Sequence, residues 1–469
     1  MFEKVLIANR GEIAVRVART CERLGIATVA VYSEVEEDSL HRQTCDEAIC
    51  VGPARVQDSY LNQDAILAAA KQTGAQAIHP GYGLLSENAD FVRKVAAAGL
   101  SFVGPSPEII ELFADKVRAK ALARQAGVRV TPGSDEALAD PELAAREADS
   151  IGYPVLVKAA GGGGGIGIQI VLDAEQLGKA LEICSGRARA AFGDERVYLE
   201  RYLERPRHVE VQVIGDRHGQ LVALGERECS IQRRHQKIVE ESPAPALIFG
   251  RHAEERREAL FDAALRIAQE AGYYNVGTAE FILDAEGRAY FMEWNPRLQV
   301  EHTVTEMCTG LDLVEWQLRI AAGERLPNEV LRAEPRGHAI EARIYAEDSL
   351  KGFLPKPGEV KTLRWPPLAP GSLRIEAGIA PGSKVTSHYD PMVAKVITFG
   401  ATRHQAILTL DRVLAETEIE PLVTNLAFLR SVLAHDSFRA GQYDTDFVQR
   451  LLAELAEAPA DTGRDSLSP

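Results

Sequence analysis

Short apolar runs alternate with amphipathic stretches along residues 1–103. The apolar runs predict buried strands, and the stretches between them carry apolar residues at helical spacing. We expect strands at 5–8, 28–32, 48–51, 76–79 and 100–103, and helices at 13–24, 65–72 and 89–98. Strands that alternate with helices form a doubly wound parallel sheet, whose ligands gather at the carboxyl ends of the strands. The pattern therefore predicts an α/β fold that begins with a parallel-sheet domain over residues 1–114.

The same patterns divide the rest of the chain into smaller units. A helix near 115–125 is followed by Gly127, Pro132 and Gly133, which predict a hinge into a small mobile lid. Further strands are expected at 209–214, 220–226, 339–345 and 393–399, and further helices at 254–271, 404–414 and 447–456. The predicted divisions are a helical linker at 115–131, a lid at 132–203, a core at 204–335, a C-terminal α+β domain at 336–446, and a last helix with a disordered tail at 447–469.

Acidic residues stand where a half-buried hairpin normally carries apolar ones. Two β-rich runs flank an Asp/Gly turn at 284–287, and strand side chains alternate faces with a period of two. The expected register places Glu280 opposite Phe291 and diagonal to Glu293, with Cβ atoms about 7–8 Å apart. Carboxylates and an amide oxygen are the hard ligands that Mg²⁺ prefers, and phosphate oxygens usually complete its shell. Glu280, Glu293 and Asn295 therefore predict a site for a metal-bound nucleotide.

A charged edge strand that resists aggregation is the alternative interpretation of these acids. If only Glu280 or only Glu293 were present, a charged edge strand would be favoured over a metal site. A one-residue slip of register would also put the two carboxylates on opposite faces and remove the site. Both acids occur together, however, and polar residues continue at every second position through Arg297, Gln299 and Glu301. This periodic polar face favours a binding site.

A run of glycines at 161–165 follows the predicted strand that carries Lys158. Successive glycines let backbone N–H groups converge on an anion without interference from Cβ atoms. The spacing formally satisfies a dinucleotide-binding fingerprint, but that motif must open a helix, whereas the Ile-Gln-Ile-Val run at 168–171 predicts a strand. A Walker loop is excluded because its lysine follows the glycines, and Lys158 precedes them. A flap that closes over phosphates remains, and a flexible exposed hairpin is its alternative.

A second cationic cluster, QRRHQK, spans residues 232–237. Taken alone, it predicts a solvated face or a ladder of ion pairs. A reaction that joins two anions, however, needs Lys and Arg side chains to offset repulsion and to stabilise developing charge. Beside a nucleotide site, the cluster is therefore a candidate for the floor of an anion-binding pocket.

Bulk properties exclude several classes of function. The chain has 469 residues and a formal net charge of −15 at pH 7, which provides no basic field for nucleic acid or an anionic membrane. No apolar run is long enough to span a bilayer, and the N-terminus enters a strand at once. The six cysteines are scattered without metal-finger spacing, which indicates buried thiols in a reducing compartment. We therefore expect a cytoplasmic protein that binds neither nucleic acid nor membrane.

Taken together, these motifs resemble the biotin carboxylase component of acetyl-CoA and other acyl-CoA carboxylases, within the ATP-grasp superfamily. The resemblance extends from residues 7–14 to residues 447–455, nearly the whole chain. It rests on the runs at 79–83, 86–88, 161–165, 206–210, 232–237, 293–302 and 337–343. It implies an ATP-grasp fold and the MgATP-dependent carboxylation of carrier-bound biotin by bicarbonate through carboxyphosphate.

The resemblance implies a role for each residue that matches the family's motifs. ATP would be contacted by Lys116, Lys158, Gly164, Gly165, Glu200, Arg201, Tyr202, Leu203, His208, Gln232 and His235. Mg²⁺, or Mn²⁺ in its place, would be held by Glu280, Glu293 and Asn295. Bicarbonate would be faced by Lys237, Arg297, Gln299 and Val300. Glu301 would act as general base, Arg343 would stabilise the enolate-like oxygen of biotin, and Tyr82 would flank the biotin pocket.

The sequence departs from the family in places. Ile166 stands where a basic residue usually follows the glycines, and Gln169 stands where Arg is frequent. These lost charges affect lid closure and ATP affinity more than the type of reaction, because the backbone donors of the flap remain. Trp294 stands where Met is common, and we expect it to face away from the metal. For Arg343, a strand-face ion pair with Glu341 is the alternative role.

The family delivers biotin on a lysine within Met-Lys-Met, a tripeptide that does not occur in this sequence. We therefore expect a biotin carboxyl carrier protein supplied by another chain, or by another part of a longer protein. Carboxyltransferase subunits and a homodimer are also expected by resemblance. The acceptor that finally receives the carboxyl group belongs to the transferase, and this sequence leaves it open.

Two other functions remain open on the sequence. One is a different ATP-grasp ligase that phosphorylates another carboxylate, such as a peptide or carbamoyl-phosphate type, and Arg343 with Lys237 argues against it. The other is a non-catalytic nucleotide-binding subunit of a carboxylase complex, made conceivable by Ile166 and Gln169. The intact acids of the hairpin argue against this second alternative.

Overall fold

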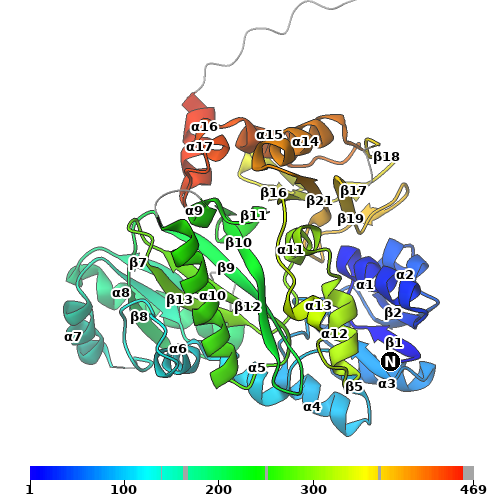
Figure 1. The fold of residues 1–469 in the computed structure, drawn as a ribbon, viewed down its shortest axis with the longest axis horizontal. Helices are drawn as coiled ribbons and strands as arrows, with labels where there is room; N and C mark the ends of the chain where they lie inside the picture. Colours follow the sequence, from blue (N-terminus) through cyan, green and yellow to red (C-terminus); the bar gives the residue numbers. More distant parts are fainter. Residues whose placement is uncertain (139, 162–166, 249–251, 368–370, 458–469) are drawn as a thin grey trace, which may run out of the picture.

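The computed structural model of the chain describes residues 1–138, 140–161, 167–248, 252–367 and 371–457. Its fold is α/β, as predicted, with a five-stranded parallel sheet, a large antiparallel sheet and a small three-stranded sheet as its main parts (Figure 1). The predicted disordered tail at 459–469 and the flap glycines Gly164 and Gly165, with Ile166, lie outside the described residues.

The N-terminal unit is a parallel sheet in the strand order β3-β2-β1-β4-β5, as the alternating pattern predicts. Its strands are β1 Lys4–Ile7, β2 Ala27–Ser33, β3 Glu47–Gly52, β4 Ala77–His79 and β5 Ser101–Phe102. Its helices are α1 Gly11–Leu24, α2 Leu40–Thr44, α3 Gln63–Thr73, α4 Ala89–Ala97 and α5 Pro107–Ala114. Gly25 ends α1 in the left-handed region at φ 70°, and Asn62 and Asn88 cap α3 and α4.

An eight-stranded antiparallel sheet forms the centre of the molecule, in the order β13-β12-β9-β10-β11-β14-β21-β19. Its strands are β9 Arg207–Gly215, β10 Leu221–Arg233, β11 Gln236–Ser242, β12 Asn275–Leu283, β13 Ala289–Asn295, β14 His338–Tyr345, β19 Leu373–Ala377 and β21 Met392–Gly400. The pairing of β11 with β14 carries the sheet across residue 335 into the C-terminal region. One continuous surface therefore spans both the central and the C-terminal parts of the chain.

A three-stranded sheet in the order β7-β6-β8 forms the small unit seen at the left of Figure 1. Its strands are β6 Val155–Ala159, β7 Ile168–Val171 and β8 Val197–Arg201, with helices α7 Pro141–Ile151 and α8 Ala174–Phe192 packed on it. Strands β6 and β7 are antiparallel, and Lys158 pairs with Ile168. The glycine run therefore joins two strands of a hairpin, as predicted, rather than opening a helix.

Shorter elements connect and cover these sheets. The remaining helices are α6 Lys116–Gln125, α9 Pro245–Ile248, α10 Ala253–Glu270, α11 His302–Thr309, α12 Leu313–Ala321, α13 Asn328–Leu331, α14 Arg403–Glu416, α15 Leu426–Ala434, α16 Asp436–Arg439 and α17 Phe447–Glu457. The remaining strands are β15 Glu347–Asp348, β16 Leu354–Pro355, β17 Gly358–Glu359, β18 Thr362–Arg364, β20 Lys384–Val385 and β22 Glu418–Glu420, and 3₁₀ turns lie at Glu34–Glu36, Val56–Asp58 and Ser349–Lys351.

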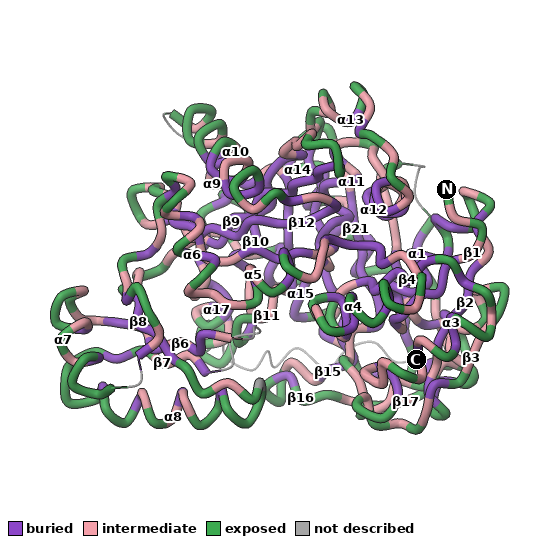
Figure 2. The backbone as a smooth tube through the Cα atoms, turned by 90° about the horizontal axis from the view of Figure 1, so that it is seen from below, coloured by how far each residue is buried: buried purple, intermediate pink, exposed green. Residues whose placement is uncertain are grey.

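The core lies along the central sheet. Figure 2 shows buried residues concentrated on β9, β10, β12 and β21, while α7, α8 and α10 expose one side. The apolar face of β9, with Val209, Val211 and Val213 fully buried, packs with α10 in one cluster. The opposite face of the same strand carries His208, Glu210 and Gln212, which are also buried. Period-two alternation thus gives this strand one apolar and one polar buried face.

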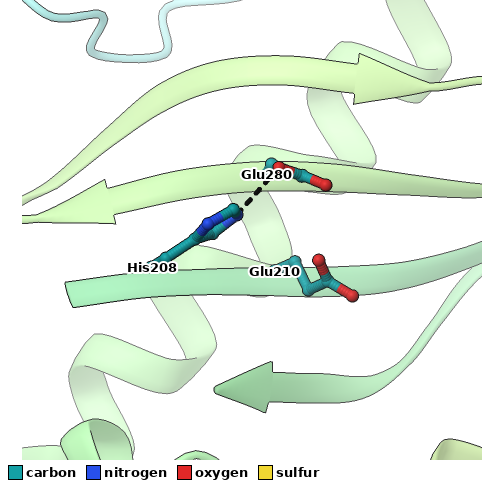
Figure 3. A group of neighbouring side chains, drawn as sticks. All are labelled: His208, Glu210 and Glu280. Carbon is teal, nitrogen blue, oxygen red and sulfur yellow. Dashed lines mark ion pairs between the residues drawn. The ribbon is translucent and has the colours of Figure 1, made fainter. Parts of the chain in front are cut away.

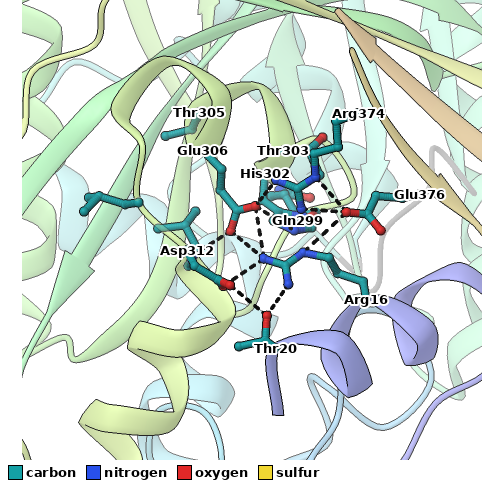
Figure 4. A network of polar contacts seen from close by, with 12 residues as sticks. Arg16, Thr20, Gln299, His302, Thr303, Thr305, Glu306, Asp312, Arg374 and Glu376 are labelled. Carbon is teal, nitrogen blue, oxygen red and sulfur yellow. Dashed lines mark hydrogen bonds and ion pairs between the residues drawn. The ribbon is translucent and has the colours of Figure 1, made fainter. Parts of the chain in front are cut away.

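A network of buried charges joins the N-terminal unit to the rest of the molecule (Figure 4). Arg16 of α1 lies 2.9 Å from the Glu306 carboxylate and 2.8 Å from that of Asp312, and only 4% of the Arg16 residue is exposed. Arg374 of β19 lies 2.7 Å from both Glu306 and Glu376. Three segments distant in sequence are therefore held together by ions that each have a partner.

The cysteines and the helices can be compared with the expectations of buried thiols and of no membrane span. All six cysteines are free, but Cys50 is exposed and Cys45 is half-buried, so the expectation of six buried thiols is wrong for these two. Cys50 lies on β3, an edge strand of the parallel sheet with one side uncovered, and Cys45 follows α2 just before this strand. Among the described residues, no helix combines the length and apolar character needed to cross a membrane.

Candidate active site

A cavity of about 1360 Å³ lies between the three sheets. Every described residue that the sequence analysis placed in the site lines this cavity. These residues are Tyr82, Lys116, Lys158, Glu200, Arg201, Tyr202, Leu203, His208, Gln232, His235, Lys237, Glu280, Glu293, Asn295, Arg297, Gln299, Val300, Glu301 and Arg343. Side chains from the N-terminal unit, the small unit and the central sheet thus meet in one space.

The register of the β12–β13 hairpin differs from the prediction. Glu280 pairs directly with Glu293, whereas Phe291 pairs with Phe281, and a register shift separates the two pairs. The expected placement of Glu280 opposite Phe291 is therefore wrong. The irregularity adds one residue, Met292, to β13 and turns Glu293 to the same face as Glu280, an effect typical of a β-bulge. The two carboxylates come closer together than the regular register allows.

Asn295 completes the polar end of this hairpin. Its amide nitrogen donates to Glu280 Oε1 at 2.8 Å, and its amide oxygen accepts a hydrogen bond from Arg297 at 3.1 Å. Gln299 donates to the same oxygen of Glu280 at 3.1 Å. The neighbouring Trp294 points the other way, as expected, and stacks on Phe113 with ring centroids 5.1 Å apart.

Cationic side chains neutralise the buried acids around Glu280. Lys237 Nζ lies 2.9 Å from Glu280 and 2.5 Å from Glu210. His208 Nε2 lies 2.8 Å from the second oxygen of Glu280, and Figure 3 shows this contact between neighbouring strands β9 and β12. Lys116 forms an ion pair with Glu293. Glu280 and Glu293 are therefore each already paired with a lysine from another element.

These pairs set the protonation states. Burial alone would raise the pKa of Glu280, but Lys237 and His208 outweigh it and hold this pKa far below its usual value. Burial would likewise lower the pKa of Lys116, yet the carboxylate of Glu293 raises it above the usual lysine range. Glu280 therefore presents an ionised carboxylate at neutral pH.

The donor set fits a hard divalent cation. Glu280 and Glu293 are ion-paired acids on one face, and the side-chain amide of Asn295 contacts Glu280. Such oxygens suit Mg²⁺ or Mn²⁺, which would have to take the place of the lysine contacts. His208, Glu210 and Glu280 also bring ligand atoms within 4.8 Å of one another, but Lys237 already neutralises two of these three.

A second group of charges lies at the end of the cavity formed by the small unit. Lys158 of β6 lies 2.5 Å from the carboxylate of Glu200 on β8, and Lys120 of α6 pairs with the same carboxylate. Burial, assisted by the nearby charge of Lys116, lowers the pKa of Lys158 to about 8. Burial and Lys158 also lower the pKa of His235. This end is rich in cations and suits phosphate groups.

Arg297 and Gln299 form part of the cavity floor. Arg297 donates to the Gln299 side-chain oxygen at 2.7 Å and pairs with Glu87 of the loop before α4. Arg297 lies two residues beyond the end of β13, and its guanidinium also donates to the backbone carbonyl of Leu298 at 3.2 Å. The floor can therefore present guanidinium and amide donors to a small anion.

Glu301 lies between two cations at the centre of the site. One oxygen lies 2.6 Å from Lys237 Nζ, and the other lies 2.9 Å from Arg343 Nη2. Burial would raise the pKa of Glu301, but Lys237, Arg343 and Arg227 outweigh it and hold the pKa well below its usual value. Only 1% of Glu301 is exposed, so this carboxylate is fixed, ionised and shielded from bulk water.

Arg343 has a wider role than a pair with Glu341 along its own strand. Its guanidinium lies 2.5 Å from Glu240 and 2.9 Å from Glu301, while the Glu341 contact is longer at 3.9 Å. Nearby, the hydroxyl of Tyr82 donates to the carboxylate of Glu12 on α1. This part of the wall therefore combines one guanidinium with a fixed aromatic ring.

The sequence analysis missed several charged residues behind these side chains. Arg227 is fully buried and donates to Glu210 at 2.5 Å, and Glu210 in turn holds Lys237. A usable signal was present, because Glu210 and His208 are two residues apart on a strand and share a face. Glu240 gave no comparable signal, since its partner Arg343 is distant in sequence.

Comparison with known proteins agrees with this geometry. Residues 1–110 and 341–450 match the N-terminal and C-terminal domains of biotin carboxylase. Residues 115–329 match the ATP-binding domain of the carbamoyl-phosphate synthase L chain. A biotin carboxylase of Halalkalibacterium halodurans is 52% identical over 448 residues, which cover 96% of this chain and 97% of that protein.

Longer relatives contain the same region. The mitochondrial methylcrotonoyl-CoA carboxylase subunit alpha of Oryza sativa is 48% identical over 97% of this chain, which covers 61% of the rice protein. The crystal structure of the Hydrogenobacter thermophilus 2-oxoglutarate carboxylase biotin carboxylase domain dimer, in complex with MgADP, ADP and bicarbonate, superimposes with a TM-score of 0.91. The two sequences are 44% identical, and the match covers 96% of this chain and 98% of that domain. The chain belongs to the biotin carboxylase family.

Proposed function

We propose that this protein carboxylates carrier-bound biotin with bicarbonate at the expense of ATP. The observation that carries the proposal is Glu301, an ionised carboxylate held between Lys237 and Arg343 at the meeting point of the acidic hairpin and the anion-binding floor. A carboxylate in this position can take a proton from an anion that the neighbouring cations bind.

In the first step, the formation of carboxyphosphate, different residues of the chain would bind ATP, Mg²⁺ and bicarbonate. Lys116 and Lys158 would bind the phosphates of ATP, and Glu280, Glu293 and Asn295 would hold Mg²⁺, which offsets phosphate charge when bound. Lys237, Arg297, Gln299 and Val300 would orient bicarbonate beside Glu301. Glu301 takes the proton of bicarbonate, and a bicarbonate oxygen attacks the γ-phosphorus of ATP. The bond between this phosphorus and the β–γ bridging oxygen breaks, which gives carboxyphosphate and ADP.

The second step would use the opposite wall of the cavity. Carboxyphosphate breaks into CO₂ and phosphate, and the phosphate takes the ureido proton of biotin. Arg343 stabilises the enolate-like oxygen that results, and the biotin nitrogen then attacks CO₂. Because Glu301 has a lowered pKa, it is a weak base, so its fixed position rather than its basicity would account for its contribution.

The geometry also bears on the two alternative functions. A ligase for another carboxylate does not need the Arg343–Glu301 contact of 2.9 Å that joins the two halves of this cavity. A non-catalytic subunit does not need a base that is 1% exposed and flanked by two cations. Both observations favour the biotin carboxylase reaction.

The proposal also covers the protein partners and the cellular location. We propose a biotin carboxyl carrier protein and carboxyltransferase subunits as partners, a homodimer, and a cytoplasmic location, which six free cysteines support. We further propose that the carboxyl group passes to an acyl-CoA such as acetyl-CoA. The rice relative is a methylcrotonoyl-CoA carboxylase subunit and a human relative is a propionyl-CoA carboxylase chain, which supports an acyl-CoA, whereas the Hydrogenobacter thermophilus structure belongs to a 2-oxoglutarate carboxylase.

ADP release by the purified protein with MgATP tests the reaction. Bicarbonate and free biotin are added singly and together, and the account expects the greatest stimulation with both. Stimulation by an amino acid or ammonia instead would indicate another ligase. No ADP release under any of these conditions would indicate a non-catalytic subunit.

A further inference from the structure

Lys395 of β21 is a lysine with a fully buried side chain behind the cavity wall. Its ammonium donates to the backbone carbonyl of Val300 at 2.5 Å and lies 3.4 Å from Glu12 Oε1. Lysine is almost never fully buried without partners, because an ammonium loses strong hydration on leaving water. A lysine buried at this position therefore needs an explanation. Lys395 is not among the described residues that line the cavity, so direct contact with a ligand there does not provide one.

The contact with Val300 bears on the general base of the proposed reaction. The carbonyl of Val300 belongs to the planar peptide unit that joins this residue to Glu301. Fixing the carbonyl therefore fixes the backbone from which the Glu301 side chain departs. Glu301 also stands immediately before α11, so this peptide sets how the floor of the cavity enters the helix.

The contact with Glu12 bears on the other wall. The same oxygen of Glu12 that faces Lys395 accepts the hydroxyl of Tyr82, and the Lys395 ammonium lies 5.9 Å from the centre of the Tyr82 ring. The second oxygen of Glu12 is buried and has no hydrogen-bond partner among the described residues. Lys395 is therefore the principal ion that holds this carboxylate, and through it the aromatic wall.

We propose that Lys395 is a positioning residue that couples the bicarbonate floor to the biotin wall by holding the Val300 carbonyl and Glu12 at once. The inference rests on the proposed function and deepens it, because none of the sequence motifs singled out this lysine. Lys395 fixes the distance between the base Glu301 and the ring of Tyr82, so that bicarbonate and biotin meet across a constant gap. The nucleotide end of the cavity is built from other elements and does not depend on Lys395.

Replacement of Lys395 by methionine separates this role from a purely structural one. Methionine keeps the length and apolar stem of lysine but leaves the Val300 carbonyl unpaired. Removing one partner of a buried hydrogen bond costs enough to change an equilibrium about tenfold. In Lys395→Met we expect the KM for bicarbonate to rise about tenfold, while the Kd for MgADP changes by less than about twofold. Lys94→Met, at an exposed lysine of α4 that pairs with Asp64 of α3, is the matched control and should keep both values.

A structural role predicts a different result. If Lys395→Met weakens MgADP binding and bicarbonate use to the same degree, or leaves the KM for bicarbonate unchanged, the inference is overturned. Wild-type protein without bicarbonate-stimulated ADP release would refute the proposed function and remove the inference with it. Wild-type stimulation combined with an unchanged KM in Lys395→Met would overturn the inference alone.

A second variant covers the case in which Lys395→Met does not fold. Glu12→Gln keeps the shape of the side chain and removes the charge that faces Lys395. We expect it to raise the KM for bicarbonate about threefold and to reduce stimulation by biotin, with MgADP binding retained. Where both single variants fold, the double variant should match Lys395→Met alone, because the two residues act as one unit. Independent, additive effects would contradict the proposed coupling.

Discussion

Glu280 of β12 and Glu293 of β13 face each other directly across neighbouring strands. Two like charges in this arrangement destabilise a sheet unless other groups neutralise them. Here Lys237 neutralises Glu280, which His208 also contacts, and Lys116 neutralises Glu293. The sheet thus keeps a pair of ionised carboxylates in position, and a divalent cation with a nucleotide can take over the neutralisation.

Loss of one of these carboxylates should weaken metal binding selectively. In Glu280→Gln, we expect the affinity for Mn²⁺ in the presence of ADP to fall at least about tenfold, because one anionic ligand becomes a neutral amide. Electron paramagnetic resonance of Mn²⁺ measures this directly. Glu286→Gln in the exposed turn of the same hairpin is the control and should bind as the wild type does. Equal binding by the two variants would remove Glu280 from the metal site.

Removal of the central carboxylate should stop turnover without preventing nucleotide binding. In Glu301→Ala, bicarbonate-dependent ADP release is expected to fall by about 10²–10⁴-fold, the usual contribution of a positioned base. Calorimetric titration with MgADP should give an affinity close to that of the wild type, since Glu301 lies beyond the phosphate-binding end. Retained turnover in this variant would exclude Glu301 as the base.

Nucleotide affinity should depend on pH through Lys158. Its pKa is lowered to about 8 by burial and by Lys116, so Lys158 is cationic below pH 8 and loses its charge as the pH rises through this value. Binding of a phosphate favours the charged form, and the affinity for MgADP should therefore fall between about pH 8 and pH 10.

Lys158→Arg provides the comparison, because a guanidinium stays charged across this range. Its MgADP affinity should be nearly flat over the same pH interval, whatever its absolute value. A wild-type affinity that does not fall above pH 8, or a variant with the same pH profile as the wild type, would contradict the assignment.

The buried network between α1 and the central region should matter for stability. Arg16→Met leaves the carboxylates of Glu306 and Asp312 short of a buried partner, and we expect a loss of about 3–5 kcal/mol in the free energy of unfolding. Arg93→Met removes an exposed pair with Glu111 and should leave the free energy of unfolding nearly unchanged. Urea unfolding followed by circular dichroism compares the two, and equal losses would show that burial of Arg16 is unimportant.

Local pattern was enough to predict many of the strands and helices and the acidic face of the hairpin, because period and turn chemistry are local properties, whereas most other residues of the cavity were implied only by the family resemblance. The β1–α1–β2 alternation and the hairpin around the glycines are examples. The register of Glu280 was wrong by two residues: the turn pairs Leu283 with Ala289 instead of Arg288, and the extra residue Met292 shifts the pairing once more, an irregularity that leaves no mark in a period-two pattern. Partners such as Lys395 and Val300 could not be predicted, since β21 and the cavity floor meet only when the sheet is complete.

Transfer of an oxygen atom tests the central claim most directly, because the proposed attack joins a bicarbonate oxygen to the γ-phosphorus. The protein is incubated with MgATP, biotin and ¹⁸O-labelled bicarbonate, and the released phosphate is examined by ³¹P NMR. The account predicts one ¹⁸O atom in each phosphate formed, and loss of this labelled product in Glu301→Ala. Phosphate that takes its new oxygen from water instead would contradict the account.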